Sequence, residues 1–342
     1  MRKVFFLIFS VVLFASCEVE FSPNDKWSEI PVVYCLLDQD EDSTYVRLER
    51  CFLAEGDQRN YINNPDSLYY PVGSVKVFIE EWALNRNGNV TGSAPKRVFD
   101  FDYMESGARA EGEFYNGSAP LYVCNTAGAL DTGCLYRLRV VKTATGDTII
   151  SGETRLIRGD MTLINPNNTT YFQFGGTSRT CIFEWTALRE ARQYQPIVRF
   201  YYRDFVINYD HSPIDTTINY HHIDIPGNTV KSSLHERTLS TRMDQSFFLA
   251  TVRQNIEDVT IPKNIIDTVD IFIVCCTEPL AAYIYANNPA GGINQEPFEY
   301  TNITGGLGFF AARRRHISFR IITPNSSRTN YIQSLKELNV GF

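Results

Sequence analysis

Short runs of alternating apolar and polar residues, separated by turn signals, recur along most of this chain. Residues 75–80 and 135–141 follow this pattern, and the triplet 145–147 is a turn that leads into residues 148–150. Alternation predicts half-buried strands. Many short strands at turn spacing predict a sandwich. We therefore expect a mainly β protein with two β-sandwich domains of the immunoglobulin or fibronectin kind.

The second half of the chain carries a tryptophan strand. Cys181, Phe183 and Trp185 share one face of the run 181–186, and a polar loop leads to a second strand over 194–202. This arrangement resembles the B and C strands of a fibronectin type III sandwich. We therefore expect a fibronectin-like fold for the second domain.

Other segments add a helix and further strands to that domain. The spacing predicts a helix over 244–256 with Asp244 as its cap, Phe247, Phe248, Thr251 and Val252 lying on one side. A short helix is expected over 279–287, a strand buried on both faces over 269–275, and final strands over 307–310 and 316–322. A polar turn at 164–168 suggests a boundary, so we place the domains at 30–158 and 159–342.

The chain opens with an export signal. Arg2 and Lys3 precede an apolar run over 4–14, and small residues lead to Cys17. That layout is typical of a secretory signal, and the run is far shorter than the roughly 20 residues that span a bilayer as a helix. Residues 13–17 resemble the lipobox of bacterial lipoproteins. The resemblance implies a signal peptide over 1–16, acylation of Cys17 (including palmitate as one acyl chain) and a polar tether over 17–29.

The composition excludes one class of partner. The net charge is −7, and no sustained basic run is present. Nucleic-acid binding depends on neutralising phosphates, so we expect no such partner.

Glu18 follows Cys17, where an aspartate would retain many lipoproteins in the inner membrane. We therefore expect a lipid-anchored protein of the outer membrane, on either its periplasmic or its cell-surface face.

Seven cysteines follow Cys17, and export to an oxidising compartment permits disulfides. Cys124 and Cys134 bracket a short loop that contains glycine, so we expect them to pair. Cys275 and Cys276 are neighbours in an apolar run, where they should point to opposite faces and one should lie in a core. The chain has no CxxC pair, so a zinc ribbon is not predicted.

No recognised catalytic or cofactor motif is present. His221 and His222 would face opposite ways on a strand, although Asp210, His211 and Asp224 lie near them in sequence. The HExxH zinc pattern, the Gly-x-Ser-x-Gly elbow and the P-loop lysine are all missing. Gly305–Gly308 is interpreted as a turn before a strand. We therefore predict no catalytic residue, cofactor or metal site from sequence.

Arg313–His316 is the one basic cluster. We interpret it as a solvated strand edge or hairpin, where charge discourages aggregation, with an anion or lipid-headgroup contact as the alternative.

A recurrent triplet of Asp, then Ser or Thr, then a small or aliphatic residue resembles the O-glycosylation acceptor of exported Bacteroidota proteins. The same residues are also favoured in turns, so both interpretations stay open. The candidate acceptors are Ser43, Ser67, Thr148 and Thr216.

Three stretches resemble a family of Bacteroidota outer-membrane lipoproteins that is catalogued as a domain of unknown function. They are residues 31–53, Trp185 with residues 194–202, and residues 294–313. The resemblance implies an accessory role, because such proteins often accompany TonB-dependent outer-membrane transporters. We therefore expect a non-enzymatic lipoprotein that binds a ligand or a partner. A hydrolase of envelope or dietary polymers and a structural adhesin or stalk are the alternatives.

Overall fold

The computed structural model describes residues 29–52, 61, 64–107, 117–167, 169–174, 179–204, 220–233, 236–256, 263–287 and 300–322. Several sequence predictions fall outside these residues: the signal peptide, residues 17–28 of the tether with Cys17, Asp210, His211, Thr216 and the stretch 294–299.

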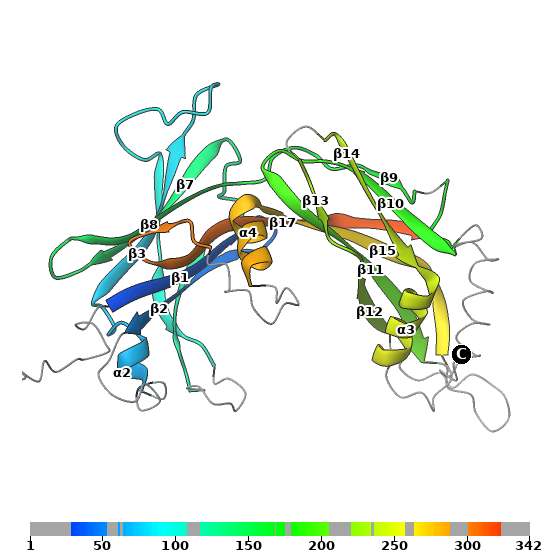
Figure 1. Cartoon of the computed structure of the whole chain (residues 1–342), viewed down its shortest axis with the longest axis horizontal. Helices are drawn as coiled ribbons and strands as arrows, with labels where there is room; N and C mark the ends of the chain where they lie inside the picture. Colours follow the sequence, from blue (N-terminus) through cyan, green and yellow to red (C-terminus); the bar gives the residue numbers. More distant parts are fainter. Residues whose placement is uncertain are drawn as a thin grey trace, which may run out of the picture.

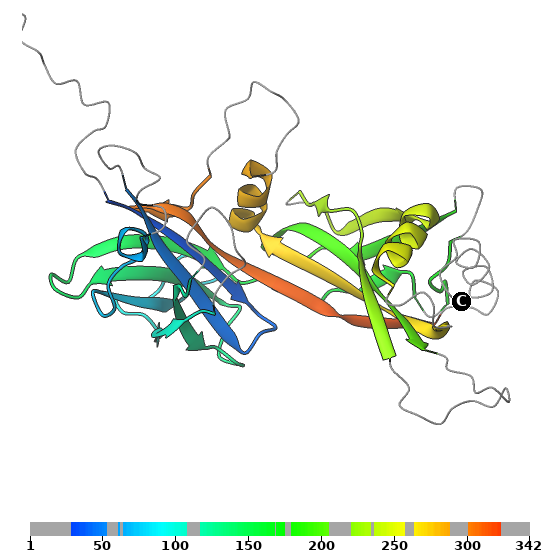
Figure 2. The same cartoon turned by 90° about the horizontal axis from the view of Figure 1, so that it is seen from below.

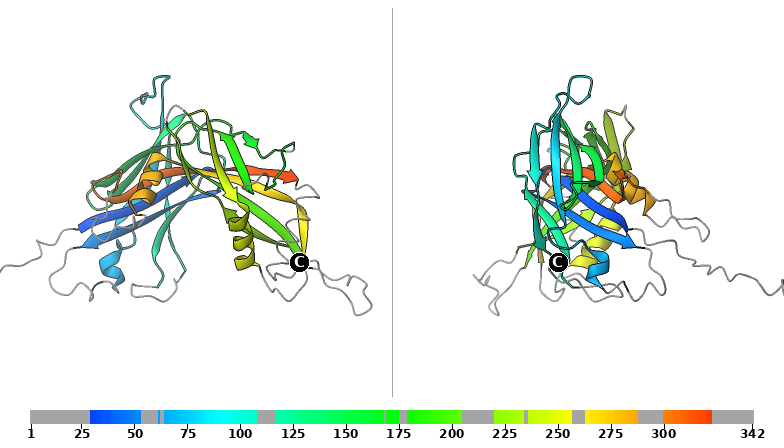
Figure 3. Two further views of the ribbon diagram at one scale, coloured as in Figure 1. Left: turned by 45° about the vertical axis from the view of Figure 1, so that its right-hand side comes forward. Right: turned by 90° about the vertical axis from the view of Figure 1, so that its left-hand side faces the viewer.

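Two lobes lie side by side along the long axis (Figures 1 and 3). The first half of the chain supplies β1 (Glu29–Asp38), β2 (Ser43–Phe52), α2 (Pro65–Leu68), β3 (Val75–Ala83), β4 (Arg97–Asp100), β5 (Asp102–Glu105), β6 (Pro120–Asn125), β7 (Cys134–Lys142) and β8 (Thr148–Arg155). The second half supplies β9 (Leu163–Asn165), β10 (Thr180–Thr186), β11 (Ala191–Asp204), β12 (Tyr220–Pro226), β13 (Val230–Lys231), β14 (Thr238–Asp244), α3 (Gln245–Asn255), β15 (Lys263–Thr277), α4 (Glu278–Ala286), β16 (Ile303–Thr304) and β17 (Leu307–Ile322).

Three sheets build the two lobes. A nine-stranded sheet runs in the order β12-β11-β15-β17-β1-β2-β6-β5, with β13 paired to β11. A five-stranded sheet, β16-β8-β7-β3-β4, forms the second layer of the first lobe, and β14-β10-β9 forms that of the second. The predicted mainly β, sandwich-like fold is confirmed. The tryptophan strand β10 and its successor β11 lie in opposite sheets, as B and C strands do in immunoglobulin-type sandwiches.

Each lobe has its own core, formed by the alternate residues of facing strands. In the first lobe Val77 and Ile79 of β3 pack with Leu138 of β7 and Val33 of β1. In the second lobe, Phe183 and Trp185 of β10 pack against the other sheet and Phe248 of α3. Burial of Cys181, Phe183 and Trp185 confirms the predicted strand face. Phe247 is an exception to the predicted helix face, because it is 47% exposed while Phe248 and Val252 are buried.

Strand β17 joins the lobes. Residues 307–313 pair in parallel with β1, and residues 313–322 pair with β15 in the antiparallel sense. Figure 2 shows β17 (orange to red) continuing from one lobe into the other. The two final strands expected from sequence are therefore one strand. Sequence analysis also placed residues 303–312 in the second domain, whereas Ile303 and Phe310 lie in the first core.

The basic cluster is a further correction. Arg313–Arg315 lies in this central strand, at the point where it crosses between the lobes, and not at an edge or in a hairpin. The side chain of Arg313 donates from Nε to Asp38 (2.7 Å), Arg314 donates to the carbonyl of Gly159 (2.7 Å), and the backbone N–H of Arg315 donates to Asp40. The charges of Arg313 and Arg314 are accommodated because acceptors from both lobes meet them there.

Candidate functional site

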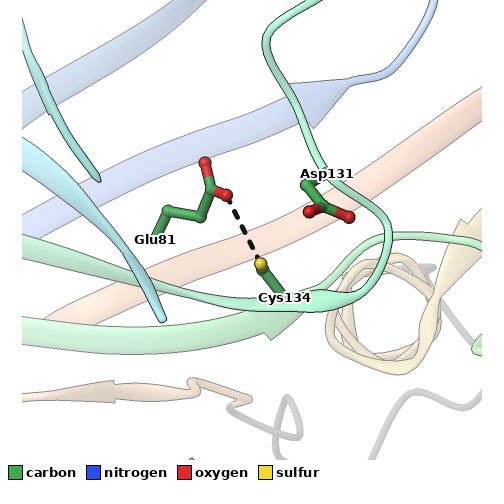
Figure 4. Close-up of side chains that lie close together, drawn as sticks. All are labelled: Glu81, Asp131 and Cys134. Atoms are coloured by element: carbon green, nitrogen blue, oxygen red, sulfur yellow. Dashed lines mark hydrogen bonds between the residues drawn. The ribbon is translucent and has the colours of Figure 1, made fainter. Parts of the chain in front are cut away.

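Four polar side chains meet at one end of the five-stranded sheet. Glu81 comes from β3, Lys96 precedes β4, Asp131 lies in the loop before β7, and Cys134 begins β7. We call these residues the Glu81 cluster. Figure 4 shows the carboxylate of Glu81 directed toward the Cys134 sulfur, with Asp131 on the adjoining loop.

Local hydrogen bonds fix the loop that carries Asp131 and Cys134. The N–H of Gly133 donates to Oδ1 of Asp131 (2.8 Å), and that of Cys134 donates to the Asp131 carbonyl (3.2 Å). The hydroxyl of Tyr136 accepts from the Asp131 N–H (2.6 Å) and donates to the Asp131 carbonyl (3.1 Å). The bond from Gly133 forms an Asx turn, and together with the other three bonds it sets both side chains beside Glu81.

The contacts within the Glu81 cluster are short. The thiol of Cys134 donates to Oε1 of Glu81 at 3.3 Å. The Lys96 ammonium lies 3.0 Å from Oε1 of Glu81, 2.7 Å from Oδ2 of Asp131 and 4.0 Å from the Cys134 sulfur. Glu81 is completely buried, and its second oxygen, Oε2, has no hydrogen-bond partner. Nε of Arg97 lies 3.9 Å from that oxygen.

The charges set the protonation states. The hydrogen bond from Lys96, helped by that from Gly133, lowers the pKa of Asp131, so this group is a carboxylate at neutral pH. Burial, then the hydrogen bond to Glu81, raises the pKa of the Cys134 thiol to about 12. A protonated thiol is a poor nucleophile. The Glu81 cluster therefore binds the Lys96 ammonium between two carboxylates. Cys134 does not have the properties of an activated, nucleophilic cysteine.

His221 and His222 point to opposite sides of β12, as predicted, since His221 pairs with Tyr202 and His222 with Tyr201 across the ladder to β11. Nε2 of His221 lies 3.1 Å from Oδ2 of Asp204, which also binds Lys263. The ring of His222 lies against Tyr201 at 6.2 Å. Asp224 binds Arg199, so the structure does not bring His221, His222 and Asp224 to one metal site.

A pocket of about 220 Å³ lies between the lobes. Its lining includes Glu153, Arg155, Glu190 and Arg192. These charges are largely satisfied by one another and by neighbours: Glu190 binds Arg158 at 3.1 Å and lies 3.9 Å from Arg155. No histidine lines this pocket.

The nine-stranded sheet turns a charged and aromatic face away from the second core. Across the ladders, Arg199 lies opposite Asp224 on one side and Asp270 on the other. We call this surface the arginine–aromatic face; its residues are Arg199, Tyr201, His222, Asp224, Asp270, Phe272, Arg315 and Arg320. 

Contacts between strands hold this face in one arrangement. Arg199 makes two bonds to Asp224, at 2.7 and 2.8 Å, and its guanidinium lies 4.8 Å from the centre of the Phe272 ring. Asp270 accepts from Tyr201 at 2.6 Å and from Arg320 at 3.0 Å. The hydrogen bond from Arg199 lowers the pKa of Asp224.

The predicted disulfide is wrong in this structure. Cys124 and Cys134 are free thiols on strands of different sheets, and Cys134 is committed to Glu81. The neighbouring Cys275 and Cys276 are both buried, with Cys275 in the second core, as the strand pattern predicted. Among the candidate glycosylation sites, Thr148 is exposed, whereas Ser43 and Ser67 are half-buried.

Sequence reasoning missed the Glu81 cluster and the arginine–aromatic face. Glu81, Lys96 and Asp131 are far apart in sequence and fit no motif, and the face depends on cross-strand register. The only local sign of the Glu81 cluster in the sequence was Glu81 itself, directly after the alternating run 75–80. A glutamate at that position is equally typical of a solvated strand end.

Comparisons with known proteins leave the family open. No family model matches the chain, and no curated protein matches it. Among solved structures, one similar chain belongs to a cytokine receptor complex (crystal form 1A), at 9% identity and a TM-score of 0.22, covering 86% of this chain and 99% of that one. A likeness of that size supports no inference about this protein. Within the described residues, none of the helices has the length and apolar character needed to span a bilayer.

Proposed function

We propose that this chain is a lipid-anchored protein of the outer membrane that binds a protein partner through its arginine–aromatic face. The lipobox-like residues 13–17 support the anchor, with Cys17 as the acylated residue. The observation that carries the binding role is the preorganised set of arginine and aromatic side chains on the sheet face that points away from the second core, where His222, Arg315 and Arg320 are exposed. Arginine and tyrosine are enriched among the residues that dominate protein interfaces.

The charges of the face indicate the chemistry of the partner. Arg315 has a ring contact to Phe272 but no ion pair within the described part of the chain, and Arg320 is 68% exposed. The Arg315 guanidinium can bind a further carboxylate in planar, bidentate geometry. Arg320 already binds Asp270 through Nε and Nη2, so only its remaining terminal nitrogen, Nη1, is left for a partner. The partner we propose is therefore an integral envelope protein that presents acidic residues, and a TonB-dependent transporter beside the anchor fits this description.

Residues that are held in place before binding lose less conformational entropy when a partner docks. Here the hydrogen bonds that Arg199 donates to Asp224 and Tyr201 donates to Asp270 fix both side chains in advance. This argument favours binding over the hydrolase alternative. The described histidines lie outside the inter-lobe pocket, and His221 is engaged by Asp204.

Photo-crosslinking in cells tests the proposal. A benzophenone amino acid replaces His222, which is exposed on the face; the matched control places it at Thr145, in the exposed turn between β7 and β8. We expect one discrete adduct with an integral outer-membrane protein from position 222 and none from position 145. Arg315→Ala combined with Arg320→Ala should abolish it. The absence of an adduct at 222, or an adduct that the double variant leaves intact, would contradict the proposal.

A further inference from the structure

The Glu81 cluster brings together ligand types that bind a transition metal. One carboxylate oxygen of Glu81, one of Asp131 and the sulfur of Cys134 all lie within 4.8 Å of one another. Thiolate and carboxylate are both zinc ligands, and a catalytic or exchangeable site needs three protein ligands and one open position. We propose that this cluster is a binding site for a zinc-class divalent cation, and that the Lys96 ammonium occupies it when the metal is absent.

The geometry fits such an ion. Bond lengths of about 2.3 Å to sulfur and about 2.0 Å to oxygen place the two atoms about 3.5 Å apart in a tetrahedral centre. The observed separation between the Cys134 sulfur and Oε1 of Glu81 is 3.3 Å. Asp131 lies on the exposed side of the cluster, where a small movement of its side chain brings an oxygen closer.

An unsatisfied buried oxygen also points to a missing ligand. Glu81 is fully buried, and its carboxylate is directed at Cys134, yet Oε2 has no hydrogen bond. A buried acceptor without a hydrogen-bond partner destabilises the folded state. A metal ion bound by both oxygens of this carboxylate would satisfy it, whereas the Lys96 ammonium reaches only Oε1.

Lys96 can leave the site. Its side chain is 45% exposed, whereas Glu81 and Cys134 are buried, so the ammonium can swing into water while the ligands stay in place. When the metal binds, the Cys134 thiol loses one proton to solvent and forms the metal–sulfur bond. Two carboxylates, one ammonium and a neutral thiol carry one negative charge in sum; two carboxylates, one thiolate and a divalent ion carry the same. The exchange therefore leaves the local charge unchanged.

The effect of removing Lys96 distinguishes a metal site from an ordinary ion pair. An ordinary pair would be weakened by loss of Lys96, because two carboxylates would then repel each other without a counter-ion. A metal site would instead bind its ion more tightly, since the competing ammonium is gone. The site does not depend on the partner-binding function proposed above.

Cobalt binding to the reduced mature chain tests the proposal, because a thiolate bound to Co²⁺ gives a near-ultraviolet charge-transfer band. The test is made in a Cys51→Ser background, which removes the exposed thiol. We expect a band that zinc abolishes, and about tenfold tighter cobalt binding in Lys96→Met. The band should vanish in Cys134→Ser and binding should weaken in Asp131→Asn.

Two matched controls accompany these variants. Lys76→Met removes a lysine that pairs with Asp100 on the same sheet at 2.9 Å, and Cys124→Ser removes a half-buried thiol of the same lobe; neither should change cobalt binding. A band that persists in Cys134→Ser, or no band in either the wild type or Lys96→Met at millimolar cobalt, would overturn the proposal. Circular dichroism of each variant confirms that it is folded.

Discussion

Gly308 shows how one residue can determine whether the lobes join. It lies opposite Val33 in the parallel ladder between β17 and β1, at φ +102°. A Cβ atom there would lie 1.9 Å from the carbonyl oxygen of Val33. Only glycine permits so close an approach of two backbones at positive φ.

Replacing Gly308 by alanine should therefore destabilise the protein by more than about 2 kcal/mol, because the clash is with backbone and cannot be relieved by a rotamer change. Gly128→Ala is the control: Gly128 also has positive φ (+60°), but nothing lies within 4 Å of its added Cβ. That change should cost about 1 kcal/mol. Urea unfolding measures both. Equal losses in the two variants would show that the close approach is not important.

At the scale of residues, the sequence predicted burial and turns where these depend on the local pattern alone. Burial of Val75, Val77 and Ile79 followed from their alternation, and the turn at Gly305 followed from its composition. Glu81 could not be predicted, because its burial depends on Lys96 and Cys134, which arrive from other segments. The alternation of apolar and polar residues along a strand carries no information about a charge that tertiary contacts neutralise.

At the scale of elements, β17 depends on an ion pair where it crosses the junction. Asp38 at the end of β1 is almost completely buried, and Arg313 of β17 is its described partner. Removing one member of a buried pair leaves the other charge uncompensated, at a cost of about 3–5 kcal/mol when both are fully buried.

Arg313→Ala should destabilise the protein by about 2–3 kcal/mol, less than that full penalty, because the Arg313 side chain is partly exposed. The surface pair of Lys76 and Asp100 is the comparison, since both of its side chains are about 60% exposed. Lys76→Ala should change the stability by less than about 1 kcal/mol. Urea unfolding of single variants and of the double variant Arg313→Ala, Asp38→Asn measures the coupling. Independent, additive effects would contradict a functional Asp38–Arg313 pair.

The same strand explains why its prediction from sequence was incomplete. Three consecutive arginines end an apolar run, so residues 307–322 were divided into two strands. The strand nevertheless continues through these residues, because Asp38 and the Gly159 carbonyl bind the side chains of Arg313 and Arg314, and Asp40 accepts from the backbone N–H of Arg315. Helices α3 and α4 and the strands β3, β7 and β10 were predictable because a single face of each decides its burial.

At the scale of the whole molecule, the lobes share a sheet and do not merely touch. β17 pairs with β1 of the first lobe over residues 307–313 and with β15 of the second over residues 313–322. The first core contains Phe310 and Ala312, so it is incomplete until the last described strand has returned to it. The linear order of the sequence suggests two separable domains, whereas the topology makes the first depend on the end of the chain.

We therefore expect the two lobes to unfold in one cooperative transition, because neither can keep β17 in place when the other is lost. Trp82 of β3 reports on the first lobe and Trp185 of β10, which is fully buried, on the second. Two chains that each keep one of these residues, with the remaining tryptophans replaced by phenylalanine, should show the same urea midpoint by fluorescence and by circular dichroism. In these chains Gly308→Ala should lower both midpoints together. Midpoints that separate, or a Gly308→Ala effect confined to the Trp82 signal, would mean that the shared strand does not couple the lobes.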